Sequence, residues 1–242
     1  MSADRKKGLV IIPAYNEEGA IIDTVKGIEA KAPEFDIMVV NDCSTDSTAM
    51  LLEKNGIDHI NLSMNLGIGG AVQTGYIYAW ENGYDAAVQM DGDGQHDASY
   101  LHKMYYTMQK ERADMVIGSR FIENEGFQSS SLRRVGINFF TKWIRMLTHQ
   151  TVTDPTSGMR MVNRRIIELF ARDYPKDYPE PETVVSVLKQ GYTISEIPVR
   201  MLARTTGESS ISMRKSVYYM LKVSIACLIA SWSADLSGGK EK

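Results

Sequence analysis

Short apolar runs alternate with polar loops and longer amphipathic stretches through the first half of the chain. Each run has the length of a β-strand and ends abruptly in polar residues. The runs are Gly8–Pro13, Ile37–Val40, Ile57–Leu62, Ala86–Met90 and Met115–Gly118. Because strand, polar loop and helix repeat in this order, the pattern predicts right-handed βαβ units and a mostly parallel sheet. The 242 residues, 43% of them apolar, suffice for one large α/β domain.

Two carboxylates follow the fourth run directly. Asp91 and Asp93 are separated by one glycine, and positions i and i+2 of extended backbone point to the same side. Two carboxylates that converge repel each other unless a cation lies between them. Gln95 continues the series with an amide oxygen, and Mg²⁺ or Mn²⁺ prefers such oxygen ligands. The pattern therefore predicts a divalent-metal site, with an acidic, glycine-rich surface turn as the alternative.

Polar residues at the ends of the other predicted strands complete a candidate ligand site, because ligands of open α/β sheets bind beyond the carboxyl ends of the strands. These residues are Tyr15, Glu17, Asp42 and Arg120. The turn 65–71 contributes Gly67 and Gly70, and a glycine-rich turn that opens a helix can bind an anion. A turn that merely packs closely is the alternative for these glycines. The combination favours a nucleoside diphosphate with its metal.

Seven motifs in order resemble family 2 glycosyltransferases, most closely the dolichol-phosphate mannosyltransferase-like and polyprenyl-phosphate glycosyltransferases. The motifs are Ile12-Pro13-Ala14-Tyr15-Asn16-Glu17, Asn41-Asp42-Cys43-Ser44-Thr45-Asp46, Asn65-Leu66-Gly67, Asp91-Gly92-Asp93-Gly94-Gln95-His96, Gly118-Ser119-Arg120, Asp154-Pro155-Thr156-Ser157-Gly158-Met159-Arg160 and Arg204-Thr205-Thr206-Gly207-Glu208-Ser209-Ser210. The resemblance implies a GT-A (Rossmann-like) fold, an α/β architecture with a mostly parallel central sheet flanked by helices. It also implies metal-dependent, inverting transfer of a sugar from a nucleotide sugar to an undecaprenyl- or dolichyl-type polyprenyl phosphate, for cell-surface glycan synthesis.

By this resemblance, each donor motif has a role. Pro13, Tyr15 and Glu17 border the base and ribose, Asp42 holds the base, and Asp91, Asp93 and Gln95 carry Mg²⁺ or Mn²⁺ and the donor diphosphate. The resemblance favours a UDP-sugar, with a GDP-sugar as the alternative. Two positions depart from the family pattern. Ile68-Gly69-Gly70 stands where many relatives have a lysine or arginine, and Cys43 stands where glycine is common.

The acceptor side is predicted from basic residues, because arginine binds phosphate through a two-pronged guanidinium. The candidates for the acceptor phosphate are Arg120, Arg133, Arg134, Ser157 and Arg160. Asp154, together with Arg120 and Arg160, is the preferred catalytic group, acting as a base or an orienting carboxylate. The alternatives are a structural ion pair between Asp154 and Arg160, a solvated helix start at 133–134, and a base at Glu180 or Glu182. The polar stretch 200–212 is expected to be a loop closing over the donor.

The chain ends in an apolar run, Val217 to Trp232, interrupted by Lys222. The run is shorter than the roughly 20 residues that span a bilayer. Arg214 and Lys215 precede it and favour contact with anionic lipid. We therefore expect a catalytic domain over 1–212 and an apolar amphipathic or interfacial helix with a tail over 213–242. This helix could contact a membrane surface, a small membrane protein, a second copy of the chain or its own domain.

Bulk properties exclude several classes of protein. A net charge of −3 gives no argument for nucleic-acid binding, and Cys43 with Cys227 suggests neither a disulfide framework nor a zinc site. The apolar run after the charged start is too short for a signal peptide, so we expect a cytoplasmic enzyme peripheral to the inner face of the cell membrane. Two alternatives stay open: transfer to a hydroxyl of a growing glycan, which requires a base, and a nucleotide-binding module without turnover.

Overall fold

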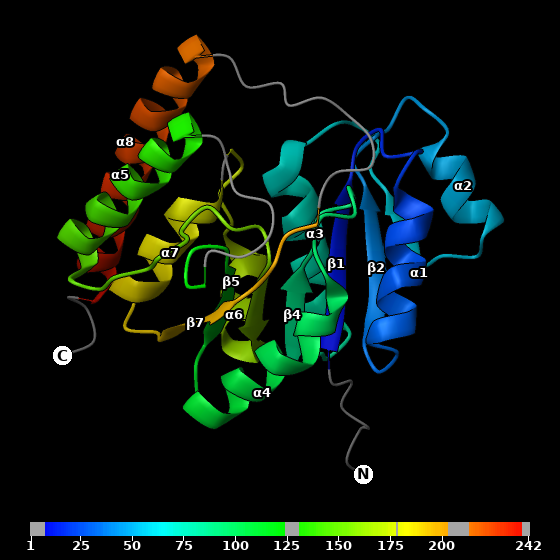
Figure 1. Ribbon diagram of the computed structural model, residues 1–242, viewed down its shortest axis with the longest axis horizontal. Coiled ribbons are helices and arrows are strands. Elements are labelled where there is room, and N and C mark those ends of the chain that lie inside the picture. The colour runs from blue at the N-terminus through cyan, green and yellow to red at the C-terminus, as the bar shows by residue number, and fades with distance from the viewer. Residues whose placement is uncertain (1–7, 124–130, 178, 203–212, 239–242) are drawn as a thin grey trace.

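The computed structural model describes residues 8–123, 131–177, 179–202 and 213–238, and these form a seven-stranded mixed sheet between two layers of helices (Figure 1). The strand order is β3-β2-β1-β4-β6-β5-β7. The strands are β1 (Gly8–Ala14), β2 (Asp36–Asn41), β3 (His59–Asn61), β4 (Ala86–Gln89), β5 (Met115–Ser119), β6 (Arg160–Asn163) and β7 (Ile194–Pro198). The helices are α1 (Ile21–Lys31), α2 (Thr48–Lys54), α3 (Gly67–Glu81), α4 (Leu101–Glu111), α5 (Ser131–Thr148), α6 (Arg164–Arg172), α7 (Pro179–Lys189) and α8 (Met213–Gly238).

The predicted mostly parallel sheet is confirmed, and its one antiparallel strand was not predicted. β6 runs antiparallel between β4 and β5, while the other neighbouring pairs in the sheet are parallel. The residues of β6 begin with an arginine and end with an asparagine, so they lack the apolar run that marks a buried strand. Because β6 is reversed, residues that precede it lie at the same edge of the sheet as residues that follow β4 and β5.

Both faces of the sheet are buried. Along β1, Leu9 and Ile11 belong to one apolar cluster, and Val10 and Ile12 belong to the other. This alternation follows from the two-residue period of a strand covered on both sides. α1 and α4 pack on the face of Val10, whereas α3, α6 and α7 pack on the face of Leu9. The core therefore holds the strand ends, and the loops that follow them, in a fixed arrangement.

α8 lies beside α5 and α7 at one end of the molecule (Figure 1). Val223 and Cys227 are buried in this contact, whereas Leu221, Ile225 and Ile229 are exposed. The contact with its own domain, one of the predicted alternatives, is thus observed for one side of the helix. None of the helices in the described part of the chain combines the length and apolarity needed to cross a membrane. The motif 204–210 and the expected loop over 200–212 lie mostly outside the described residues.

Candidate active site

The loop after β4 presents Asp91 and holds Asp93. The Asp91 side chain is 41% exposed. Asp93 is buried, and its Oδ1 accepts a hydrogen bond from the Gln95 backbone N–H at 3.0 Å. The His96 ring is buried beneath this turn, where Nδ1 accepts the Asp91 N–H at 3.0 Å and Nε2 lies 3.7 Å from Asp91 Oδ2. An imidazole whose Nδ1 accepts carries its proton on Nε2, so it faces the Asp91 carboxylate with a donor.

These residues fit a divalent cation that shares its coordination with a substrate. A Cβ atom placed on Gly158 would lie 3.0 Å from Asp91 Oδ2, so the 158 backbone closes one side of the carboxylate. Among the described residues, no group of three or more His, Cys, Asp or Glu side chains is arranged to hold a metal ion. Two carboxylates and an amide suit Mg²⁺ or Mn²⁺ bound partly by phosphate oxygens, since such ions keep several non-protein ligands.

The loops after β1 and β2 are interlocked by hydrogen bonds. The Asn16 N–H donates to Ser44 Oγ at 3.0 Å, and Asn16 Oδ1 accepts the Thr45 N–H at 2.8 Å. The Glu17 N–H donates to Thr48 Oγ1 at 2.9 Å. Cys43 has a φ of 58°, in the left-handed region that favours glycine. This conformation explains why glycine suits position 43, where the chain departs from the family pattern.

The residues expected to border the nucleotide line these interlocked loops. Asp42 is buried, and its Oδ1 accepts the Leu66 N–H at 2.7 Å, which ties the β2 loop to the start of α3. Tyr15 is 49% exposed, whereas Pro13 is buried. A Cβ atom on Gly92 would lie 3.4 Å from the Pro13 carbonyl oxygen and 3.5 Å from Glu17 Cγ. The β1 loop and the loop after β4 are therefore direct neighbours. We refer to residues 91–96 of the latter as the metal loop, after the ligands expected there.

The glycine turn before α3 packs closely on the chain. The Gly69 N–H donates to the Lys176 carbonyl at 3.2 Å, and a Cβ atom at 69 would meet the Pro175 carbonyl oxygen at 2.1 Å. At Gly70 a Cβ atom would meet Leu66 Cβ at 2.4 Å, and Gly67 has a φ of 77°. The packing alternative is thus confirmed for Gly69, while donor binding by Gly67 and Gly70 stays a prediction.

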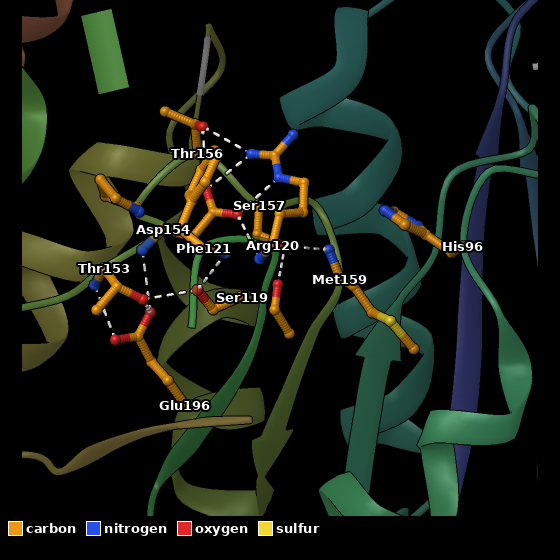
Figure 2. A network of polar contacts seen from close by, with 12 residues as sticks. His96, Ser119, Arg120, Phe121, Thr153, Asp154, Thr156, Ser157, Met159 and Glu196 are labelled. Carbon is orange, nitrogen blue, oxygen red and sulfur yellow. Dashed lines mark hydrogen bonds and ion pairs between the residues drawn. The ribbon is translucent and has the colours of Figure 1, made fainter. Parts of the chain in front are cut away.

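Arg120, at the end of β5, is held by Asp154 through two side-chain hydrogen bonds (Figure 2). Its Nε donates to Asp154 Oδ2 at 2.6 Å and its Nη2 to Oδ1 at 2.7 Å, while Nη2 also reaches Thr156 Oγ1 at 3.0 Å. Burial would lower the pKa of the Arg120 guanidinium, but the hydrogen bonds and charge of Asp154 raise it. Because both carboxylate oxygens bind Arg120, Asp154 acts here as an orienting carboxylate. This geometry argues against the preferred role as a base.

Arg120 and a second arginine, Arg134, both contact the ring of Phe121. The Arg120 guanidinium lies 5.4 Å from the centre of the Phe121 ring, and that of Arg134, from α5, lies 5.5 Å from the same centre. Both distances are typical of cation–π contacts. Two of the predicted acceptor-phosphate arginines are thus brought together. The third, Arg133, has a side chain outside the described residues.

Arg160 and Ser157 face the interior, which corrects their predicted role as phosphate ligands. Arg160 is 2% exposed, and its guanidinium donates to the carbonyls of Ser157, Glu180 and Pro155 at 2.6, 2.7 and 2.7 Å. A fourth hydrogen bond, of 2.7 Å, goes to Thr183 Oγ1. The Ser157 hydroxyl donates to the Gly118 carbonyl at 2.6 Å. With these donors satisfied inside the protein, both residues fasten the turn before β6 to β5 and α7. The ion-pair alternative for Arg160 is wrong as well, because Asp154 pairs with Arg120.

Glu180 and Glu182, in the first turn of α7, point to different surroundings. Burial raises the pKa of Glu180, the nearby Arg160 partly offsets this, and Asp91 raises it further. Burial and Asp173 raise the pKa of Glu182. The charges of Arg160, Asp91 and Arg120 thus contribute to the pKa shift of Glu180, whereas the charge that raises the pKa of Glu182 is that of Asp173. Of the carboxylates predicted as a base, Glu180 has the more suitable environment, since a general base benefits from a pKa nearer neutrality.

Comparison with known proteins places this geometry in a family. Residues 9–170 match the family model described as glycosyl transferase family 2. The chain belongs to this family. The fold is shared with a solved structure: glucosyl-3-phosphoglycerate synthase from Mycobacterium tuberculosis, in complex with Mn²⁺, UDP-glucose and phosphoglyceric acid, superimposes with a TM-score of 0.72 at 17% identity. The match covers 93% of this glycosyltransferase and 79% of that chain, and it shows the GT-A fold.

Curated relatives of this glycosyltransferase confirm the predicted subgroup resemblance. It is 29% identical over 213 residues to undecaprenyl-phosphate mannosyltransferase of Micrococcus luteus, covering 84% of this chain and 87% of the relative. It is 27% identical over 216 residues to UDP-N-acetylglucosamine–dolichyl-phosphate N-acetylglucosaminyltransferase of Methanococcus voltae, covering 80% of this chain and 84% of the relative.

Three residues of the site were not singled out from the sequence: His96, Phe121 and Glu196. His96 lies within the quoted metal motif, and Phe121 follows the Gly118-Ser119-Arg120 motif directly. Glu196 accepts hydrogen bonds from the backbone at 153 and 154 (Figure 2). Its only sequence signal is a lone carboxylate in a short stretch that contains two isoleucines, Ile194-Ser195-Glu196-Ile197.

Proposed function

We propose that this glycosyltransferase transfers a sugar, with inversion, from a UDP-sugar to a polyprenyl phosphate. The observation that carries the proposal is the pair of guanidinium groups, of Arg120 and Arg134, that contact the same Phe121 ring at 5.4 and 5.5 Å, in a site that also holds the acidic loop after β4. A basic pair beside an acidic loop suits two phosphorylated substrates, one bound through a metal and one bound directly.

The acceptor side needs positioning more than proton transfer. A phosphate monoester is already anionic at neutral pH, so its oxygen can attack the anomeric carbon without a base. As the new C–O bond forms, the bond from that carbon to the donor diphosphate breaks, and the nucleoside diphosphate leaves. Asp154 fixes Arg120 through bonds of 2.6 and 2.7 Å, and the Phe121 ring contacts the guanidinium groups of both Arg120 and Arg134. Fixed guanidinium groups hold the acceptor in line for this attack.

The donor side would be formed by the interlocked loops and the metal loop. Asp91, Asp93 and Gln95 would hold Mg²⁺ or Mn²⁺, which stabilises the departing diphosphate as a Lewis acid. Pro13, Tyr15, Glu17 and Asp42 would border the nucleoside, with Gly67 and Gly70 nearby in the turn before α3. A uridine donor is supported by the names of the Methanococcus voltae relative and of the Mycobacterium tuberculosis complex, both of which contain a UDP-sugar.

One observation favours a second candidate, transfer to a hydroxyl of a growing glycan. A hydroxyl must lose its proton, and Glu180 is a carboxylate of raised pKa whose charge interacts with Asp91 and Arg120. Relatives named for undecaprenyl and dolichyl phosphate favour the lipid phosphate instead.

We further propose that α8 brings the enzyme to the inner face of the cell membrane. Its exposed apolar residues recur along one side of the helix: Leu221, Ile225, Ile229 and Trp232, the last 77% exposed. Such a face suits the interface between headgroups and acyl chains, where a polyprenyl phosphate presents its phosphate. A small membrane protein or a second copy of the chain would use the same face.

Binding of the full chain to anionic phospholipid vesicles tests this placement. We expect Ile225→Asn with Ile229→Asn to abolish cosedimentation, because both side chains are exposed and their loss leaves the fold intact. Tyr106→Ser on α4 is a matched control, since Tyr106 is a large side chain that is 62% exposed elsewhere. Unchanged vesicle binding by the double variant would refute the membrane proposal.

The transfer itself is tested with purified chain, Mn²⁺, a panel of UDP- and GDP-sugars carrying a radioactive sugar, and undecaprenyl phosphate. We expect label in the organic phase with one UDP-sugar and no label in excess EDTA. Product only with a soluble hydroxyl acceptor would support the second candidate. Product with GDP-sugars alone would overturn the assignment of uracil as the nucleobase of the donor.

A further inference from the structure

Glu196, on the edge strand β7, is a partly buried carboxylate that the proposed reaction does not use. It accepts three hydrogen bonds: from the Thr153 N–H at 2.8 Å, from Thr153 Oγ1 at 2.9 Å and from the Asp154 N–H at 3.0 Å (Figure 2). Burial raises the pKa of Glu196, and these three hydrogen bonds offset the shift only in part. None of the ion pairs among the described residues includes Glu196. A desolvated carboxylate without a cation costs folding free energy, so its presence calls for a role.

Two chains of hydrogen bonds end at Glu196. In the first, Asp154 offers its N–H to Glu196 and its carboxylate to Arg120. In the second, the Thr153 hydroxyl donates its one hydrogen to Glu196, so Ser119 Oγ, 2.6 Å away, must be the donor to Thr153. Ser119 Oγ then accepts the Phe121 N–H at 3.3 Å. Both hydroxyls of this series of hydrogen bonds, those of Thr153 and Ser119, thus donate in a fixed direction, and Glu196 sets that direction.

We infer that Glu196 is a positioning residue for the acceptor phosphate, and this inference rests on the proposed function. One chain reaches Arg120 through its carboxylate partner, and the other reaches Phe121, on which Arg120 and Arg134 stack. Glu196 therefore fixes the orientation of both guanidinium groups without touching either substrate. Its loss weakens binding of the phosphate acceptor and leaves donor binding unchanged, because the donor loops lie on β1, β2 and β4.

Asp114 provides a matched control for a structural effect. It accepts hydrogen bonds from the N–H and the hydroxyl of Thr193, at 2.9 and 3.1 Å, and from Asn163 Nδ2 at 2.7 Å. This arrangement repeats the one between Glu196 and Thr153, but it lies before β5, at the opposite end of the strand from Arg120. The two carboxylates differ in one respect. Asp114 forms an ion pair with Arg165, whereas Glu196 forms no ion pair among the described residues.

The experiment compares Glu196→Gln with Asp114→Asn in the full chain. Binding of UDP with Mn²⁺ and binding of farnesyl phosphate, a short prenyl phosphate, are measured separately by calorimetry, and the acceptor KM is measured with undecaprenyl phosphate. We expect Glu196→Gln to weaken farnesyl phosphate binding and raise the acceptor KM on the order of 10-fold, as small misplacements of positioning groups do. UDP binding should stay unchanged. Asp114→Asn should lower the melting temperature and leave both affinities unchanged.

Variants at Thr153 separate positioning from bulk packing. Thr153→Ser keeps the hydroxyl that links Ser119 to Glu196, whereas Thr153→Val keeps the shape and removes it. We expect the acceptor KM to rise with valine and to recover with serine. Equal farnesyl phosphate binding by the unmodified chain and Glu196→Gln would overturn the inference, as would parallel losses of UDP and farnesyl phosphate affinity. No farnesyl phosphate binding by the unmodified chain, with UDP binding intact, would overturn the proposed acceptor and the inference with it.

Discussion

Replacement of Arg160 by lysine tests the interior role that the structure gives this residue. The guanidinium makes four hydrogen bonds, three to carbonyl oxygens and one to Thr183 Oγ1, in a site that is 2% exposed. An ammonium on a shorter stem has three donors that diverge from one atom, so it cannot reach groups arranged around a planar fork. We expect about half of the four bonds to be lost in Arg160→Lys.

The magnitude follows from the charge of the donor and the burial of the acceptors. A hydrogen bond from a charged group contributes about 1.5–3 kcal/mol, and a buried carbonyl left without a donor costs a similar amount. Two lost bonds therefore predict a decrease of about 3–6 kcal/mol in the free energy of unfolding. For a chain of this size the melting temperature should fall by about 6–24 °C.

Thermal and urea unfolding, followed by circular dichroism, measure this loss. Arg172→Lys is the matched control, because Arg172 is an exposed arginine in a helical pair with Glu168, and its replacement should change stability by less than about 0.5 kcal/mol. At a temperature where both variants are folded, acceptor KM should be nearly unchanged in Arg160→Lys. Wild-type stability together with a raised acceptor KM would refute this reasoning and restore Arg160 as a phosphate ligand.

Three further predictions concern other parts of the site. Asp93→Asn keeps the acceptor for the Gln95 N–H but removes a charge from the metal loop, so kcat should fall on the order of 10²-fold or more, and full activity of the wild type in excess EDTA would contradict this. Burial raises the pKa of Glu180, so its charged form destabilises the fold above that pKa. Glu180→Gln should therefore raise the melting temperature at pH 8. This gain should vanish as the pH falls from the folded-state pKa of Glu180 to the ordinary pKa of glutamate. Cys43→Val should lower the urea midpoint, because a β-branched side chain fits a φ of 58° worse than cysteine does, whereas Cys43→Gly should not, and equal midpoints for the two variants would argue against backbone strain.

The positions of the acidic residues expected on the donor side were predictable from the sequence, because these residues follow apolar runs that indicate strands. Asp42 and Asp91 stand within two residues of the ends of apolar runs, and a parallel sheet brings the ends of such runs to one edge. The interlocking of Asn16 with Thr45 was not predictable, since it depends on the exact conformation of two loops.

The acceptor side was harder to predict because its partners come from distant elements. Whether Asp154 pairs with Arg120 or Arg160 depends on the reversed strand β6, which has no apolar run to announce it. Once β6 lies between β4 and β5, Arg160 points to carbonyls of its own turn and of α7. Motif spacing shows which residue types are present, but it does not show which of two arginines forms the ion pair with a carboxylate.

The reversed strand also has an evolutionary consequence. Residues 120–159 leave the sheet at the end of β5 and return at the start of β6, next to the point of departure, where the Gly118 N–H donates to the Met159 carbonyl at 2.9 Å. This stretch contains Arg120, Arg134 and Asp154, and its helix α5 packs against α7 and α8. A segment whose ends are adjacent can be replaced without altering the ladder between β1, β2 and β4. Under the proposed function, exchange of this segment would therefore change the acceptor side and leave the loops after β1 and β2 in place.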